Sequence, residues 1–314
     1  MNFKTLTLFF SIIITSSIYS QNNLDKTIYY DSTWTETNDK NFHYYRIVKD
    51  YHTDKDLYKI YDYYKSGVLQ MEGISKTKDY LSKEGEFTYY YENGNKKSKS
   101  NYVKSKLIGL HEEWYENGLK KLEGEYLNSE DRITNVLKIN QFWNRDNEQT
   151  VKNGEGFYEE IEINFSESGN VKEGLRDGIW KGEYDKRKRK YVEKYKKGRL
   201  ISGQSTDEEN NNYEYNEIET PPIPKNGIND FYKFLAKNYV IPKGHEKTKG
   251  KIYTQFIVEK DGSIVETKTI KSLNPELDQE AIRVIKSYEN WVPAKQRGQF
   301  VRVLFSIPIS LAGN

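Results

Sequence analysis

Residues 251–271, KIYTQFIVEKDGSIVETKTIK, have the clearest secondary-structure pattern in the chain. Apolar and polar side chains alternate from Lys251 to Glu259, which is the period of a β-strand with one buried face. Asp261-Gly262 is a hairpin turn signal, because glycine adopts a positive φ without steric cost. The extended run from Ile264 to Lys271 follows, so the stretch predicts a two-stranded hairpin.

The residues after this hairpin predict a helix and a last strand. Asn274-Pro275 is a typical helix start. Apolar residues then recur at the spacing of one helical stripe: Leu277, Ala281, Val284, Ile285 and Tyr288. Trp291-Val292-Pro293-Ala294 is expected to end the helix. The run from Val301 to Ile309 alternates again and predicts a strand.

This segment resembles the C-terminal domain of TonB-family proteins, the periplasmic end of the machinery that energises outer-membrane transporters. The resemblance begins at about Gly227 and includes many separate positions. They are Phe231-Tyr232-x-Phe234, Tyr239-x-Ile241-Pro242, Gly250, Phe256-x-Val258, Asp261-Gly262, Ser272, Leu277-Asp278-x-Glu280-Ala281, Trp291-x-Pro293-Ala294, Gly298 and the last strand. The resemblance implies a small α+β domain over residues 225–314, in the order helix, two-strand hairpin, helix, edge strand.

A proline inside the predicted last strand suggests a binding mode. Pro308 has no backbone N–H, and proline inside sheets is confined to edges and ends. An unpaired edge can accept an extended peptide by strand addition. The resemblance implies the same role, because TonB-like domains bind the TonB-box peptide of an outer-membrane transporter along this strand. The predicted partner-binding residues are Phe300, Val301, Arg302, Val303, Leu304, Phe305 and Ser306.

Alternation divides these residues between two faces. The side chains of Phe300, Arg302, Leu304 and Ser306 are expected on one face. Those of Val301, Val303 and Phe305 are expected to face the helix and the core. The alternative is a purely structural strand, with its edge covered by a second copy or by the repeats described next.

An aromatic pair, two polar residues and a glycine recur in the N-terminal part of the chain. Clear copies are 63–67, 90–94 and 114–118, a weaker one is 164–169, and a degenerate one is Phe142-Trp143-Asn144-Arg145. Asn-Gly favours a hairpin turn, and aromatic residues favour half-buried strands. Glu-Gly pairs lie between the copies: Glu72-Gly73, Glu84-Gly85, Glu123-Gly124 and Glu155-Gly156.

Stacked hairpins of this kind bury a continuous aromatic seam that no single hairpin has. Residues 21–203 are therefore predicted to form a β-hairpin repeat array, and the whole chain is expected to be mostly β with a small α+β domain. The array resembles MORN-type repeats of bacterial envelope proteins, including antitoxin-like ones. Its aromatic side chains are either only structural or also a surface for a partner or a glycan.

The first 20 residues have the pattern of a secretory signal peptide. Lys4 precedes the apolar run Leu6 to Ile14, and the small residues Ser16, Ser17 and Ser20 follow. As a helix, Leu6 to Tyr19 spans roughly 21 Å, against about 30 Å for a bilayer core. Cleavage near Ser20 is expected, which predicts an exported, periplasmic protein. A retained anchor is the alternative.

Two further segments complete the predicted domain organisation. The basic run 186–190 is followed by Tyr191, Glu193 and Tyr195 at strand spacing, which predicts a charged terminal strand that protects a sheet edge. Membrane contact through this run is at most peripheral. Residues 204–224 are acidic and end in proline, so they are predicted to be a linker before the domain at 225–314.

Composition argues against several functions. The chain of 314 residues has no cysteine, which excludes disulfides, thiol nucleophiles and a lipid-bearing cysteine. A net charge of +2 does not favour nucleic acid. The four histidines lack metal-ligand spacing, and the carboxylates lie among lysines in the pattern of solvated strand faces. No enzyme activity, metal or cofactor is predicted.

The predicted function is therefore binding. The chain is expected to be an envelope protein that binds an extended peptide of a TonB-dependent outer-membrane transporter or of another envelope partner. One alternative is a true energy transducer with a retained anchor. Another is an antitoxin-like repeat scaffold whose C-terminal domain serves only to form a homodimer.

Overall fold

The computed structural model describes residues 24–128, 136–184, 189–289 and 291–313. The predicted signal peptide over residues 1–20 lies outside these ranges. Within them, no helix is long and apolar enough to cross a membrane. The chain divides into two compact units, Met1–Gly109 with Glu113–Gly118, and Leu110–Glu112 with Leu119–Asn314.

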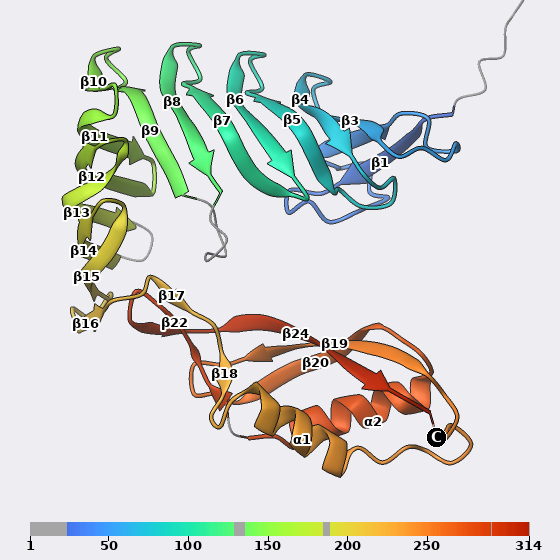
Figure 1. Cartoon of the computed structure of the whole chain (residues 1–314). Coiled ribbons are helices and arrows are strands. Elements are labelled where there is room, and N and C mark those ends of the chain that lie inside the picture. The colour runs from blue at the N-terminus through green and yellow to red at the C-terminus, as the bar shows by residue number, and fades with distance from the viewer. Residues whose placement is uncertain (1–23, 129–135, 185–188, 290, 314) are drawn as a thin grey trace, which may run out of the picture. The chain divides into compact units, whose positions relative to one another are not determined.

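The first unit consists of antiparallel strands that pair in chain order (Figure 1). Its strands are β1 (Lys26–Tyr30), β2 (Tyr44–Val48), β3 (Tyr58–Tyr64), β4 (Leu69–Ser75), β5 (Lys83–Tyr90), β6 (Lys96–Val103) and most of β7 (Lys106–Trp114). The predicted hairpin turns are confirmed at Gly67, Gly94 and Gly118, where φ is 85°, 87° and 85°. The core of this unit contains Ile28, Val48, Tyr58, Ile60, Met71 and Phe87.

The second unit continues with the same hairpin pattern. Its first strands are β8 (Lys120–Leu127), β9 (Val136–Trp143), β10 (Gln149–Lys152), β11 (Glu155–Glu162), β12 (Phe165–Lys172), β13 (Leu175–Tyr184), β14 (Arg189–Lys196), β15 (Arg199–Thr206) and β16 (Asn212–Tyr215). The degenerate copy after Phe142 is a genuine turn, in which Asn147 adopts φ 62° and its N–H donates to the carbonyl of Asn144 at 3.0 Å. Asparagine tolerates this left-handed conformation better than most residues.

The weaker copy at 164–169 was wrongly predicted to end in a turn glycine. Gly169 lies inside β12, opposite Trp180 of β13. A Cβ atom at Gly169 would lie 2.4 Å from the Trp180 ring, and one at Gly182 would lie 2.1 Å from the ring of Tyr191. These glycines therefore make room for an aromatic ring of the next strand, which is a packing requirement rather than a turn.

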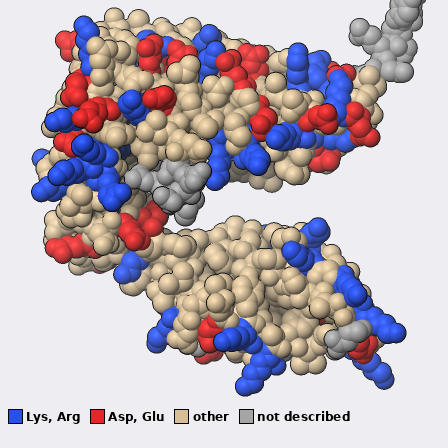
Figure 2. All heavy atoms as spheres, in the orientation of Figure 1, with Lys and Arg blue, Asp and Glu red and all other residues tan. Residues whose placement is uncertain are grey.

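The surface of the strands is rich in both signs of charge, as Figure 2 shows on the face in view. Several opposite charges are cross-strand pairs, such as Lys99 with Glu86 at 2.8 Å. Exposed pairs of this kind contribute little to stability. Two carboxylates are buried instead, since Asp62 and Glu193 are only 2% and 0% exposed. The prediction that the carboxylates belong to solvated faces is wrong for these two.

Two segment predictions differ from the structure. The strand β14 is not terminal, because it pairs with β13 on one side and with β15 on the other. About half of residues 204–224 lie in paired strands instead of forming a free linker. After β15 and β16 they form β17 (Glu219–Thr220) and β18 (Ile223–Pro224), which pair with β22 (Ala294–Gln296) and β21 (Trp291–Val292).

The C-terminal part of the second unit is the predicted α+β module (Figure 1). Its remaining elements are α1 (Ile228–Asn238), β19 (Gly250–Val258), β20 (Ile264–Lys271), α2 (Pro275–Lys286), β23 (Gln299–Val301) and β24 (Val303–Leu311). The helix start is confirmed, since the Asn274 side chain accepts a hydrogen bond from the Glu276 N–H at 2.8 Å. Tyr288 lies beyond the end of α2 but is still buried in the core. Trp291-Val292 forms a strand and does not simply end the helix.

Candidate functional site

The strand β24 lies at the edge of a three-stranded sheet in the order β20-β19-β24. It pairs with β19 over its whole length, from Gly250 opposite Leu311 to Val258 opposite Val303. Among the described residues, no strand pairs with its other side. The predicted edge position is therefore confirmed, and Pro308 lies within this strand.

Pro308 also indicates which backbone groups point to the free side. Residues along an antiparallel strand direct their N–H and C=O groups alternately to the two sides. Pro308 has no N–H to donate to β19, and its pairing with β19 shows no register shift. Leu304 and Ser306 have the same parity as Pro308. Their backbone groups therefore point away from β19, toward the free edge.

The strand predicted over Val301 to Ile309 is divided in two. Phe300 and Val301 belong to β23, which pairs with β22. Arg297 and Gly298 adopt φ 49° and 79° and reverse the chain between β22 and β23. Two of the predicted partner-binding residues are thus held in a separate hairpin. Gly298 is the one turn signal that the sequence offers at this position.

The predicted division between two faces agrees with the observed burial. Phe300 and Leu304 are 46% and 56% exposed. The ring of Phe305 packs against the core, with its centroid 5.4 Å from that of Trp291. Arg302 is exposed and forms ion pairs with Glu259 at 2.7 Å and with Glu266. These pairs join the start of β24 to the β19–β20 hairpin.

A groove of about 460 Å³ lies beside the start of β24. Val303 and Phe305 line one side of it, and Pro221 and Pro222 line another. The proline segment is held in place because β17 and β18 on either side of it are paired. The residues 219–222 were missed as site residues, since a polar, proline-ending stretch is typical of a linker.

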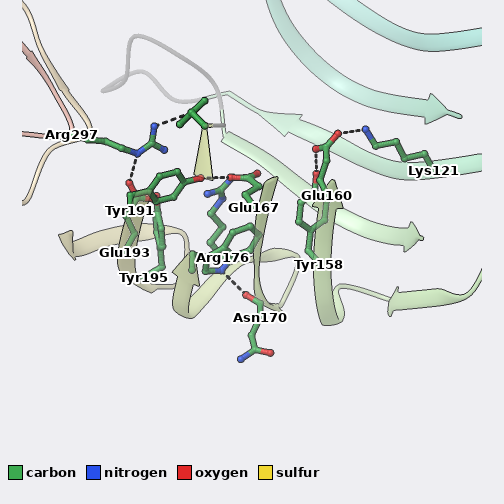
Figure 3. Close-up of polar contacts among 12 residues, drawn as sticks. Lys121, Tyr158, Glu160, Glu167, Asn170, Arg176, Tyr191, Glu193, Tyr195 and Arg297 are labelled. Atoms are coloured by element: carbon green, nitrogen blue, oxygen red, sulfur yellow. Dashed lines mark hydrogen bonds and ion pairs between the residues drawn. The ribbon is translucent and has the colours of Figure 1, made fainter. Parts of the chain in front are cut away.

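The strands β11 to β15 share a face that includes the Trp180 side chain, which we call the inner face. It carries a second polar constellation from β11, β12 and β14, which we call the carboxylate ladder: Glu160, Glu167 and Glu193 (Figure 3). Each of these carboxylates accepts a hydrogen bond from a tyrosine and pairs with a cation. Glu160 pairs with Lys121 and Tyr158. Glu167 accepts bonds from Arg176 at 2.6 Å and from Tyr191 at 2.9 Å.

Glu193 is the most buried member of the ladder and has the most donors. Its carboxylate accepts bonds from Tyr195 at 2.8 Å, from Tyr215 at 2.7 Å and from Nε of Arg297 at 2.8 Å. Burial, together with the charge of Glu193, raises the pKa of Tyr195 and of Tyr215. Both tyrosines therefore remain protonated donors at any physiological pH.

Arg297 comes from the turn between β22 and β23 and is far from Glu193 in the sequence. Its guanidinium lies 3.8 Å from the centroid of the Tyr191 ring. Its carbonyl accepts a bond from Ser205 Oγ at 2.7 Å, and the side chain of Gln299 donates to the same Oγ at 2.9 Å. Burial lowers the pKa of Arg297, but the charge of Glu193 outweighs this effect, so the pKa lies above its usual value. The turn is thus fixed on the sheet by several buried polar contacts.

The described residues contain no group of three or more histidine, cysteine, aspartate or glutamate side chains placed to bind a metal ion. The edge of β24 offers backbone groups, and the ladder offers paired charges.

Comparison with protein families bears on the module that contains β24. Residues 244–310 match the family described as Gram-negative bacterial TonB protein C-terminal. The match includes β19, β20, α2 and nearly all of β24. No curated protein is similar enough to the chain to count as a match. The segment with the free edge is therefore similar to the C-terminal region of TonB proteins.

Proposed function

We propose that this chain is an exported envelope protein that binds an extended peptide by strand addition to β24. The peptide would belong to a TonB-dependent outer-membrane transporter or to another envelope protein. The observation that carries the proposal is the free edge of β24, within a module similar to the C-terminal region of TonB proteins.

In strand addition, the affinity comes from main-chain hydrogen bonds along the free edge. The backbone groups of Leu304 and Ser306 point outward and provide main-chain hydrogen bonds to a parallel or antiparallel peptide strand. The exposed side chains of Arg302 and Leu304 contact alternate peptide residues on one face. The groove beside Val303 and Phe305 receives an apolar peptide side chain on the other face.

A titration with a matched pair of variants tests this role. TonB-box peptides from transporters of the same cell are titrated into the full chain, into Ser306→Pro and into Ser306→Ala. Proline removes one outward N–H and leaves the bonds to β19 intact, whereas alanine keeps the N–H. Saturable binding to the parent chain and to Ser306→Ala, and about tenfold weaker binding to Ser306→Pro, are expected for one lost hydrogen bond.

Two results would reject the proposal. The first is equal binding by both variants, which would place the peptide elsewhere. The second is no binding by the parent chain together with a homodimer that Ser306→Pro abolishes, since the edge would then serve a second copy. Export is tested separately by the intact mass of the protein recovered from the cell envelope, where a chain starting at Gln21 is expected.

A further inference from the structure

A pocket of about 350 Å³ lies where the turn between β22 and β23 meets the inner face of β13 to β15. It is lined by Asn164, Tyr184, Arg189, Arg297 and Gln299, among others. Pockets of this size are large enough for a small molecule. The pocket is separate from the free edge of β24, so an inference about it does not depend on the proposed peptide binding.

Arg189 is the unusual residue of this pocket. It begins β14 and has the same parity as Tyr191 and Glu193, so it belongs to the inner face with the carboxylate ladder. Its Nε atom is buried and has no hydrogen-bond partner. Because Nε is closed to solvent, a ligand in the pocket would have to bind the remaining donors of the Arg189 guanidinium.

Three other cations at the inner face each have a carboxylate partner. Lys121 pairs with Glu160, Arg176 with Glu167 and Arg297 with Glu193. Among the described residues, no carboxylate is paired with Arg189, and no aspartate or glutamate lines the pocket. Arg189 therefore differs from these three cations, because no described carboxylate pairs with it.

We propose that this pocket binds an acidic sugar, with its carboxylate or phosphate group on Arg189. Arginine presents a planar fork of donors that matches both anions. Tyr184 lines the pocket and is 36% exposed, so the accessible part of its side chain can contact a sugar ring. The amide of Asn164 can donate to and accept from hydroxyl groups. The volume suits one sugar residue.

Binding would also involve both elements that meet at this pocket. Arg297 and Gln299 come from the β22–β23 turn, whereas Tyr184 and Arg189 come from β13 and β14. A sugar in the pocket would contact both groups at once. It would therefore stabilise the contact that Arg297 makes with Glu193, because a ligand stabilises the conformation to which it binds.

Calorimetric titration of the full chain tests the proposal with four probes: glucuronic acid, glucose 6-phosphate, glucose and inorganic phosphate. Saturable binding of the two acidic sugars is expected, with glucose and phosphate each at least about tenfold weaker. Arg189→Gln is expected to weaken the acidic sugars by about tenfold or more. Arg199→Gln, an exposed arginine of β15 outside the pocket, is expected to leave them unchanged.

Several results would overturn the proposal. They are no binding of either acidic sugar, equal binding of glucose, equal binding of inorganic phosphate, or an unchanged affinity in Arg189→Gln. Circular dichroism and thermal melting establish that each variant is folded. If Arg189→Gln is not folded, Asn164→Ala tests the same pocket from a turn residue, and an unchanged affinity there would equally reject the site.

Discussion

Replacing Arg297 by glutamine should destabilise β13 to β16 much more than the same change at Arg302. The Arg297 side chain is 16% exposed and its partner Glu193 is 0% exposed. Arg302 is 46% exposed and its partners Glu259 and Glu266 are 31% and 66% exposed. Removing one partner of a buried pair costs about 3–5 kcal/mol, because the other charge is left uncompensated. An exposed pair contributes about 0–1 kcal/mol.

The structure places the expected cost at the low end of that range. Glu193 keeps the hydroxyl donors of Tyr195 and Tyr215 when Arg297 is lost. We therefore expect a loss of about 3 kcal/mol for Arg297→Gln. Since each 1.4 kcal/mol is a factor of ten, amide exchange through opening of these strands should accelerate by roughly 100-fold.

Hydrogen exchange followed by mass spectrometry measures this effect strand by strand. Peptides from β13 to β15 are compared in the parent chain, in Arg297→Gln and in Arg302→Gln. The double variant Glu193→Gln with Arg297→Gln should recover part of the loss, because the amide needs no counter-charge. Exchange in Arg297→Gln within about threefold of the parent, or an equal effect in Arg302→Gln, would refute the role of burial at this pair.

Two further predictions concern packing and pH. Gly169→Ala places a Cβ atom 2.4 Å from the Trp180 ring and should cost about 1–3 kcal/mol in urea denaturation, whereas Ser168→Ala on the other face should change stability by less than about 0.5 kcal/mol. Burial raises the pKa of Tyr239 to about 12, and its hydroxyl donates to the Leu277 carbonyl at 2.9 Å. The stability that the protonated Tyr239 hydroxyl contributes is complete below the unfolded pKa near 10 and is lost as the pH rises through about 12. Tyr239→Phe should lose about 1 kcal/mol at pH 7 and should show a smaller decline in stability over that alkaline range; an equal decline in both proteins would contradict this assignment.

The sequence predicted the elements whose signals are local. The strands β19 and β20 follow from alternation around Asp261-Gly262, and α2 follows from its cap at Asn274 and its apolar stripe. The turns at Gly67, Gly94 and Gly118 were predictable for the same reason. In each case the residues that determine the conformation are neighbours in the chain.

The elements that were missed depend on partners far away in the sequence. Residues 219–220 pair with Lys295 and Gln296, and nothing in their own composition indicates a strand. Glu193 precedes Lys194 on β14 in a run rich in lysine, which is the pattern of a solvated strand, but two of its three donors come from β16 and from Arg297. Charge alone did not distinguish a buried carboxylate from an exposed one, because burial depends on which elements cover it.

The position of Arg297 links the two constellations of the second unit. Its turn is fastened to the ladder through Glu193, and β23 leads from this turn through Arg302 directly into β24. The other strand of the hairpin, β22, pairs with β17 and so holds the segment that lines the groove beside Phe305. The β22–β23 hairpin therefore contacts β14 through its turn, and its second strand leads into the strand with the free edge. We therefore expect a change that loosens the Arg297–Glu193 contact to alter the groove as well, since the same hairpin connects the two by covalent bonds and strand pairing.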